Sequence, residues 1–340
     1  FGGYESLPPD EEAERLWEAR DVPAERIYRF GPKDNFWGPP GVTGPCGPCS
    51  EIHYDLTQVP CSDPSCGPNC ECGRFLEIWN LVFMEYNKQE QGIFDPLPSK
   101  NIDTGMGLER IALVLQRKQD IFATDLFAPI LEAVEQLCRF SLKEADEAVV
   151  RSSRVIADHI RAATFLVSDG VLPSNDGRGY VLRRILRKAL VHGRRLGHTE
   201  PFVERIMNVV IDNYQAAYPE LSDNRVFISR VLGSEEERFL QTLETGIRIF
   251  QAEGERMEAA GEKTLPGEVV FRLYDTFGFP PELTEDMAGE RGMGVDRPGF
   301  ERCMTEQREK ARASWRGDQQ QGLTQEGALA GVQSEFIGYD

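Results

Sequence analysis

The spacing of apolar side chains predicts strands in the first third of the chain. Residues 75–86 form an almost continuous apolar run with many aromatic and branched side chains, as in a buried strand. Residues 51–55 alternate between polar and apolar positions, and residues 27–30 also have the composition of a strand. Glu77 and Asn80 interrupt the long apolar run, and burying them without partners would be costly, so a functional role is favoured for both.

Elsewhere apolar residues recur at the three- and four-residue spacing of helices. Helices are expected over residues 10–20, from 108, over 125–140, around 155–163, after Tyr180, and from a capping-box pattern at 234–237. After Arg110 the pattern therefore changes from strands to helices. Residues 43–50 are so rich in Pro, Gly and Cys that a rigid loop is expected there. Beyond about residue 286 the chain has the polar, Gly- and Gln-rich composition of a linker, and residues 335–340 resemble the opening strand of another domain.

The composition is that of a globular protein, but the charge is strongly negative. The 340 residues are enough for roughly two or three domains, and 40% of them are hydrophobic. No apolar run is long enough to cross a bilayer and no signal-peptide pattern occurs, so a cytoplasmic location without a membrane partner is expected. The net charge of −18 repels nucleic acid, so any such contact must come from a local basic patch. Because the chain begins with Phe1, it is expected to be a piece of something longer.

One segment is basic against this acidic background. No acidic residue occurs between Arg178 and Arg195, and the helix expected there has one apolar face. Cations crowd its other faces, namely Arg183, Arg184, Arg187 and Lys188. A basic helix beside a turn-rich loop (168–180) fits a nucleic-acid footprint, in which the cations neutralise phosphates. The alternative is a solvated helix face with internal ion pairs, and the footprint is favoured.

Six of the eight cysteines lie between Cys46 and Cys72. Clustered thiols in a long chain without a secretory signal favour reduced cysteines over a disulfide framework. Cys46 and Cys49 form a C-x2-C pair flanked by prolines, which indicates a stiff pocket wall rather than a redox pair. The remaining four thiols of the cluster have a spacing that differs from the common C-x2-C pairs, so a tetrahedral zinc site and a loop of incidental thiols both stay open. These four are Cys61, Cys66, Cys70 and Cys72.

Residues 102–111 combine several useful groups in one short element. Two glycines, Gly105 and Gly107, leave room for a ligand near the backbone, and the helix that follows presents free N–H groups that favour an anion. Asp103 offers a carboxylate suited to an ammonium group, and Arg110 offers a guanidinium suited to a phosphate or a base. For this segment taken alone, an ordinary glycine turn into a helix is the favoured interpretation. The motifs elsewhere in the chain reverse that preference and favour a binding element.

Two single residues are also weighed. Asp275 lies in an aromatic segment bounded by Gly and Pro, 271–280, which predicts a turn between helices. Its carboxylate could accept a hydrogen bond from a base amine or cap a helix. His159 is expected to be a hydrogen-bonded histidine at a helix interface.

Taken together, a series of motifs along nearly the whole chain resembles the alanyl-tRNA synthetase family of class II aminoacyl-tRNA synthetases. The motifs are Asp34-Asn35-Phe36-Trp37, Thr43-Gly44-Pro45-Cys46-Gly47-Pro48-Cys49, Glu77-Ile78-Trp79-Asn80, the segment 103–110, the segment 154–161, the segment 175–184 and the segment 274–280. The resemblance implies an α+β fold, with the rear part of a class II antiparallel-sheet catalytic domain over 1–140. It also implies a helical tRNA-recognition domain over 141–290, and a linker with the start of a β domain over 291–340.

The resemblance implies an alanine–tRNA ligase and assigns substrate roles. ATP, with Mg²⁺, would activate alanine to an adenylate, which would then pass to the 3′ end of tRNA(Ala), bound by its acceptor stem. Asp103 and Asn80 would hold the alanine ammonium group. Trp37 and Val82 would wall a pocket sized for its methyl group, and Gly105 would make room for the substrate.

Further roles follow from the same resemblance. Arg110 would lie against ATP, with Glu77 and Gly107 helping to hold ATP or Mg²⁺. Asn175 and Asp275 would flank the G·U pair that identifies the tRNA. The stem backbone would be gripped by cations, which are Arg178, Arg183, Arg184, Arg187 and Lys188.

Parts of the family pattern do not appear in the chain. Class II motifs 1 and 2 are expected to precede Phe1, and an editing domain is expected to follow Asp340. The piece alone is therefore expected not to form adenylate at a normal rate, and detectable alanine-dependent pyrophosphate exchange would contradict this. Two alternatives are a synthetase-derived tRNA-binding module without adenylation activity, and a zinc-knuckle nucleic-acid-binding protein. The second explains the cysteines but leaves residues 103–110 without a purpose.

Overall fold

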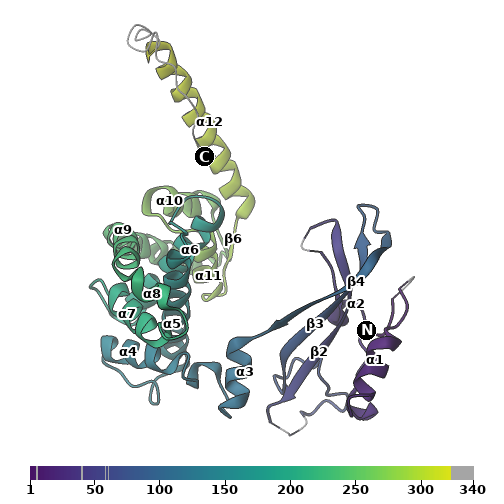
Figure 1. Cartoon of the computed structure of the whole chain (residues 1–340). Coiled ribbons are helices and arrows are strands. Elements are labelled where there is room, and N and C mark those ends of the chain that lie inside the picture. Colours follow the sequence, from purple (N-terminus) through teal and green to yellow (C-terminus); the bar gives the residue numbers. More distant parts are fainter. Residues whose placement is uncertain (5–6, 40, 58, 60, 323–340) are drawn as a thin grey trace, which may run out of the picture. The chain divides into compact units, whose positions relative to one another are not determined.

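A computed structural model describes residues 1–4, 7–39, 41–57, 59 and 61–322 of the chain (Figure 1). The chain divides into two compact units, Phe1–Pro129 and Ile130–Asp340. Strands dominate the first unit and helices the second, which confirms the α+β class expected from the sequence. No helix among the described residues has the length and apolar character that a bilayer span requires.

The first unit is built on a four-stranded antiparallel sheet with the strand order β1-β2-β3-β4. The strands are β1 (Phe36–Trp37), β2 (Gly44–Asp55), β3 (Phe75–Lys88) and β4 (Phe94–Met106). Short helical elements accompany them, namely α1 (Glu11–Glu18), η1 (Ala24–Arg26), α2 (Pro32–Asn35), α3 (Leu108–Leu115) and η2 (Ile121–Ala123). Trp17 of α1 donates its indole N–H to Ser50 Oγ at 3.1 Å, which places α1 on the face of β2 that carries Ser50.

Strand β2 corrects the expectation of a rigid loop over residues 43–50. This segment adopts an extended conformation and pairs with β3 despite its prolines. The register of the pairing shifts between Cys46 and Cys49. Gly47 and Pro48 occupy the shift, where the interrupted ladder tolerates a residue without an N–H. A side chain at Gly47 is excluded, because a Cβ there would lie 1.8 Å from the carbonyl oxygen of Phe83. Only glycine allows the two strands to approach so closely.

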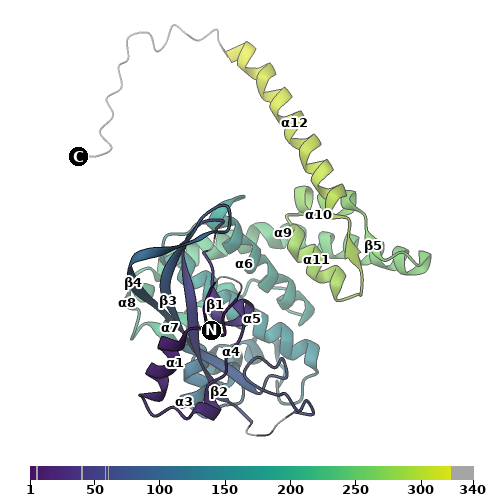
Figure 2. The same ribbon diagram turned by 90° about the vertical axis from the view of Figure 1, so that its right-hand side faces the viewer.

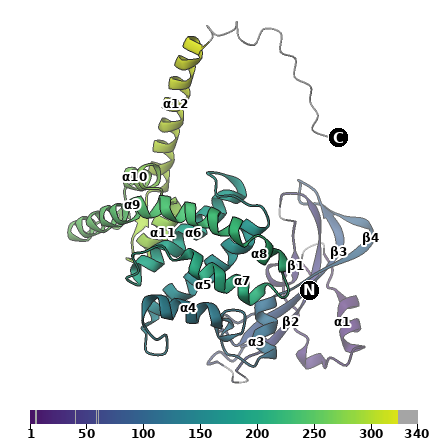
Figure 3. The same cartoon turned by 60° about the vertical axis from the view of Figure 1, so that its left-hand side comes forward.

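The second unit is a helical bundle with a small parallel strand pair, β5 (Thr264–Leu265) and β6 (Gly294–Val295). Its helices are α4 (Ala128–Cys138, in this unit from Ile130), α5 (Glu147–Ser168), α6 (Gly177–Arg195), α7 (Val203–Tyr214), α8 (Pro219–Asp223), α9 (Arg225–Ala260), α10 (Gly267–Phe277), α11 (Pro281–Gly289) and α12 (Arg297–Gly322). Helix α5 packs along α6 and α7, and α9 packs against both of these (Figure 3). Helix α10 packs against α11 and the start of α12 (Figure 2).

The core of this bundle confirms the apolar faces read from the sequence. Ile156 and Ile160 of α5 and Leu182 and Leu186 of α6 are fully buried, and Phe239 of α9 is 1% exposed. Burying such side chains contributes roughly 1.5–3 kcal/mol each. The bundle therefore has a hydrophobic core of its own.

Several sequence-based expectations about secondary structure are wrong. Residues 27–30 belong to no strand in the described part of the chain. The long helix does not start at 234–237 but at Arg225, because residues before the capping-box pattern are already helical. The expected linker after about residue 286 is occupied by the end of α11, by β6 and by α12.

Two smaller differences concern residues 102–111. Asp103 and Gly105 lie in strand β4, which continues to Met106, rather than in a turn, and α3 begins at Leu108 as expected. The buried side chain of α3 is Leu113, whereas Leu108 and Leu115 are 49% and 75% exposed. The sequence spacing predicts an apolar face formed by Leu108, Ile111, Ala112 and Leu115, but α3 contacts β3 and η2 with a different face turned inward.

The expected domain limits stay predictions. Residues 1–140 as a first domain would include α4, most of which belongs to the second compact unit. The expected opening strand at 335–340 lies outside the described residues.

Candidate functional site

One face of the four-stranded sheet gathers most of the candidate residues of the first unit. Asp103 of β4 lies opposite Val82 of β3, which lies opposite Cys49 of β2. Two residues along, Gly105 lies opposite Asn80. Directly opposed residues of antiparallel strands point to the same face, and so do residues two apart in one strand. These side chains therefore share a face of the sheet.

Among the described residues, neither Asn80 Oδ1 nor the Asp103 carboxylate on this face has a protein hydrogen-bond partner. The side-chain Oδ1 of Asn80 is buried and accepts no hydrogen bond among the described residues. Its Nδ2 donates to Glu51 Oε1 at 3.4 Å, which fixes the orientation of the amide. The Asp103 carboxylate is exposed and makes no ion pair within the described part of the chain. Asn80 and Asp103 are diagonal neighbours on adjacent strands, so their Cβ atoms lie roughly 7 Å apart. A small ammonium group between them could donate hydrogen bonds to both.

The space beside Asn80 is open. A Cβ added at Gly105 would meet nothing within 4 Å, so the glycine leaves this space free. Val82 is 7% exposed and forms an apolar floor next to Asp103. Trp37 lies on the edge strand β1 opposite Gly47 and is 36% exposed. A cavity of about 330 Å³ in this unit lies elsewhere, and none of these residues lines it.

Glu77 reaches the same face because β3 contains an irregularity. Ile52 pairs with Trp79 but His53 pairs with Glu77, so Ile78 is an extra residue in β3. This shift brings Glu77 to the side of the sheet that carries Asn80. Arg110 of α3 donates from one guanidinium nitrogen to the Glu77 carboxylate at 2.9 Å and to the Glu77 backbone oxygen at 2.8 Å. The ion pair holds the guanidinium beside the sheet, while its other N–H groups remain available.

Gly107 contributes in a different way from Gly105. A Cβ at this position would lie 3.1 Å from the Arg110 side chain. The glycine therefore makes room for Arg110 in its contact with Glu77. Its own N–H donates to the Ile78 backbone oxygen at 3.2 Å, which fastens the start of α3 to β3.

Glu51, His53 and Cys49 complete this face. The sequence indicated a pocket wall for Cys49, whereas Glu51 and His53 were not singled out as site residues. His53 Nε2 lies 2.9 Å from Glu51 Oε2, and both residues lie beside Glu77 and Asn80. Burial raises the pKa of Cys49 to about 12, so its thiol stays protonated at neutral pH. This state agrees with a wall residue rather than a redox thiol.

In the second unit, most cations of α6 are engaged by acidic residues from elsewhere in the chain. Arg187 Nε donates to Glu235 of α9 at 2.8 Å, and Arg183 Nε lies 3.1 Å from the same carboxylate oxygen. Lys188 forms an ion pair with Asp286 of α11. The acidic partners lie far away in sequence, so the basic run appeared unpaired when read alone.

The same two arginines also contact the segments that carry the residues expected to read the tRNA, Asn175 and Asp275. Arg183 donates to Oδ1 of Asn175, which lies in the loop before α6. Arg187 donates to the backbone oxygen of Gly278, directly after α10. Asp275 is exposed in the last turn of α10. The expectation that it lies in a turn between helices is therefore wrong. Arg183 and Arg187 thus brace the segments that present Asn175 and Asp275.

Two cations of the basic segment remain without an acidic partner. Arg178 is exposed in the first turn of α6, and Arg184 lies half-buried on the helix surface. Neither forms an ion pair with any residue that the structure describes. His159 contacts Asp158 at 3.1 Å, in agreement with the expected hydrogen-bonded histidine.

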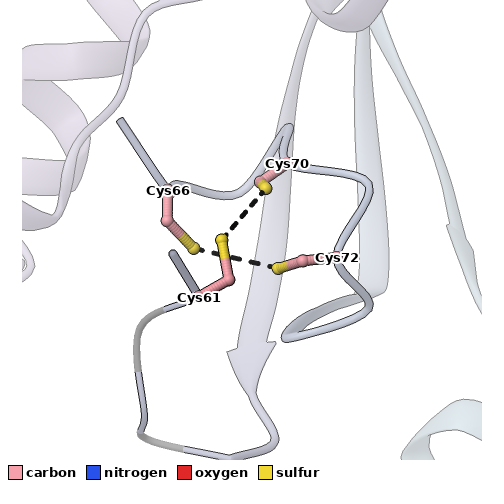
Figure 4. Close-up of side chains that lie close together, drawn as sticks. All are labelled: Cys61, Cys66, Cys70 and Cys72. Atoms are coloured by element: carbon pink, nitrogen blue, oxygen red, sulfur yellow. Dashed lines mark hydrogen bonds between the residues drawn. The ribbon is translucent and has the colours of Figure 1, made fainter. Parts of the chain in front are cut away.

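The sulfur atoms of Cys61, Cys66, Cys70 and Cys72 converge in the loop between β2 and β3 (Figure 4). Within the described ranges this is the one group of three or more possible metal ligands. The face that carries Asn80 therefore has no such group.

Comparison with known proteins agrees with the motifs and the fold. A family model described as tRNA synthetases class II (A) matches residues 4–340. The alanine–tRNA ligase of Anaeromyxobacter dehalogenans (strain 2CP-C) is 49% identical, over 100% of this chain and 40% of that protein. The corresponding ligases of Nitratidesulfovibrio vulgaris and Desulfosudis oleivorans are 48% and 47% identical, each over 97% of this chain and 38% of the relative. The chain thus spans about two fifths of the length of these curated relatives. With its motifs, its antiparallel sheet and a family match over almost its full length, the chain belongs to the class II (A) family of tRNA synthetases.

Proposed function

We propose that this chain is part of an alanine–tRNA ligase, which activates alanine with ATP and transfers it to the 3′ end of tRNA(Ala). Its relatives carry that name at 46–49% identity. The observation that carries the proposal is the pair of unpartnered acceptors, Asn80 Oδ1 and the Asp103 carboxylate, on one face of the sheet. A ligase of this kind acts where proteins are synthesised, so the proposed location is the cytoplasm.

Alanine would bind by its ammonium group between these two acceptors. A buried acceptor without a partner is costly, and an ammonium donor would satisfy it. The methyl group would lie over Val82, in the space that Gly105 leaves open and toward Trp37. The small volume beside a glycine and a valine suits a methyl side chain better than a larger one.

ATP would lie along the same face, next to Arg110 and Gly107. The guanidinium is held by Glu77 and offers its remaining donors to a phosphate or to the adenine ring. Mg²⁺ usually binds through one or two carboxylates together with substrate phosphates. Glu77 fits as a single such carboxylate, and Mg²⁺ would supply charge neutralisation of the phosphates when bound. The residues themselves position the reactants and stabilise charge.

The acceptor stem of tRNA would bind to the second unit. Asn175 and Asp275 would read the base pair that identifies the tRNA, and Arg178 and Arg184 would contact phosphates. For Arg183, Arg187 and Lys188 we propose a supporting part, because their charges are already matched by carboxylates. The charge-matched helix would then place the reading residues, whereas the unpaired cations would provide the electrostatic attraction.

A second candidate is a tRNA-binding module without adenylation activity. It is favoured by the separate hydrophobic core of the second unit, which does not depend on the sheet. The two candidates differ in whether the face that carries Asn80 and Asp103 is needed.

The test is alanine-dependent pyrophosphate exchange by the complete gene product with Asp103→Asn. Losing one charge-assisted contact of about 1.5–3 kcal/mol is expected to lower kcat/KM for alanine by roughly 10- to 150-fold. Asp95→Asn is the matched control, because Asp95 is an exposed carboxylate on the same strand but far from Asn80. An unchanged kcat/KM in Asp103→Asn would refute the alanine site. Retained tRNA binding without any exchange by the unsubstituted protein would favour the binding module.

A further inference from the structure

The loop that joins β2 to β3 is long and has little to hold it together. It runs from residue 56 to residue 74, between Asp55 at the end of β2 and Phe75 at the start of β3. Leu56 and Val59 are its only aliphatic residues, and Val59 is 67% exposed. Its described residues belong to no helix or strand. Long loops of that kind are uncommon unless function or a cross-link orders them. Hydrophobic burial supplies little of that order here.

The four cysteines of this loop have the spatial arrangement of a metal site. The sulfur of Cys61 lies 3.8 Å from that of Cys70, and Cys66 and Cys72 are also 3.8 Å apart (Figure 4). All four sulfur atoms lie within 4.8 Å of one another. Sulfur atoms about 2.3 Å from a central zinc ion, at the corners of a tetrahedron, are about 3.8 Å apart. The four thiols are free, so none is occupied by a disulfide.

The surroundings of the thiols are suited to a charged centre. Four thiolates around Zn²⁺ carry a net charge of −2, which a nearby cation would offset. Arg74 lies with one guanidinium nitrogen 3.9 Å from the Cys66 sulfur, and its Nε donates to Asp55 at 3.0 Å. The loop turns tightly between the ligands, with backbone bonds from Cys66 to Asp63 and from Cys70 to Gly67. The arginine therefore connects the cysteine group to the end of the sheet.

We propose that Cys61, Cys66, Cys70 and Cys72 bind one Zn²⁺ ion as a closed structural site that fastens the β2–β3 hairpin. Four cysteine ligands leave no position open for water or substrate, so the ion has no catalytic part. The ion would stabilise the ends of β2 and β3, the two strands that enter the loop. These strands carry Glu51 and Asn80 farther along, and the extra residue at Ile78 lies close to the loop end of β3.

The test is metal analysis of the purified 340-residue chain, with cysteine variants. A single zinc ion per chain is expected, and it should be lost in both Cys61→Ser and Cys72→Ser. Cys138→Ser and Cys303→Ser are the matched controls and should keep the metal, because both lie outside the loop. Replacing zinc with Co²⁺ should give the visible absorption of tetrahedral cobalt thiolate in the unsubstituted chain but not in Cys61→Ser.

A second measurement avoids dependence on variants that fold poorly. Thiol titration of the native unsubstituted chain should show four more reactive thiols after zinc is removed with a chelator, and the melting temperature should fall. Three results would overturn the proposal. They are a chain without metal whose four thiols react at once, peptide mapping that finds these cysteines in two disulfides, and stoichiometric iron in place of zinc.

Discussion

Replacing Arg187 with methionine tests whether the basic helix α6 is chiefly a support. The Arg187 side chain is 13% exposed, and its partner Glu235 is 3% exposed. Its guanidinium carbon also lies 4.9 Å from the centre of the Phe239 ring. Methionine keeps much of the apolar stem but removes the charge, so Glu235 would remain as a buried carboxylate with one cation fewer.

The expected cost follows from this geometry. Removing one partner of a buried ion pair destabilises a protein by about 3–5 kcal/mol. Arg183 stays 3.1 Å from the same carboxylate oxygen, so the loss is expected near the lower limit, about 3 kcal/mol. For a domain of this size that corresponds to a fall in Tm of roughly 6–12 °C. Adding Glu235→Gln should not recover this loss, because Arg183 would then lose the same carboxylate partner.

The assay combines thermal denaturation, followed by circular dichroism, with tRNA filter binding at a temperature where all variants are folded. Arg184→Met is the matched control, since Arg184 has no ion pair among the described residues, and its stability should change by no more than about 0.5 kcal/mol. If Arg187→Met keeps its melting temperature but loses tRNA binding, Arg187 contacts RNA directly and the supporting part is wrong.

Three further predictions concern other residues. Arg184→Ala should weaken tRNA binding and reduce the slope of log K against log salt by about one, with the fold intact, and an unchanged slope would contradict a phosphate contact. Gly105→Val should raise KM for alanine at least roughly tenfold because its side chain enters the open space beside Asn80; thermal unfolding should show no change. Burial lowers the pKa of His192 to about 3, and the ring contacts Ser152 Oγ at 3.0 Å. Since the unfolded chain then binds a proton that the folded chain does not, the free energy of unfolding should fall below about pH 6.5, by up to about 1.4 kcal/mol per pH unit. Urea unfolding at about pH 7.5 and about pH 5.5 should show a smaller difference in His192→Gln than in the unsubstituted chain, and equal differences would refute this.

The elements with strong periodic patterns were predictable, and so were the residues that interrupt those patterns. The run at 75–86 is part of β3, and Asn80 within it lies opposite Gly105 beside Asp103. Apolar runs of this kind are set by burial, which the sequence displays directly. The sequence also identified the cysteine loop, because the thiols are close together along the chain.

Features that depend on pairing between distant segments could not be read in the same way. The face on which Glu77 lies depends on the extra residue in β3, which no local pattern marks. Strand β2 contains residues that locally favour a turn, and pairing with β3 overrides that preference. Glu235 was read as part of a capping box, yet it is a buried partner of α6. Its place is set by tertiary contacts that only the folded chain reveals.

The extra residue Ile78 has a consequence for how this segment can change in evolution. Glu77 and Asn80 are three positions apart, so in a strand with regular pairing their side chains would point to opposite faces of the sheet. A change that made the pairing regular at its present length would therefore turn Glu77 away, and Arg110 would lose its carboxylate partner without itself being altered. Deleting Ile78 would instead leave Glu77 two positions from Asn80 and on the same face, still opposite His53. This segment can therefore lose one residue, together with its irregularity, and still keep the Glu77 carboxylate in place.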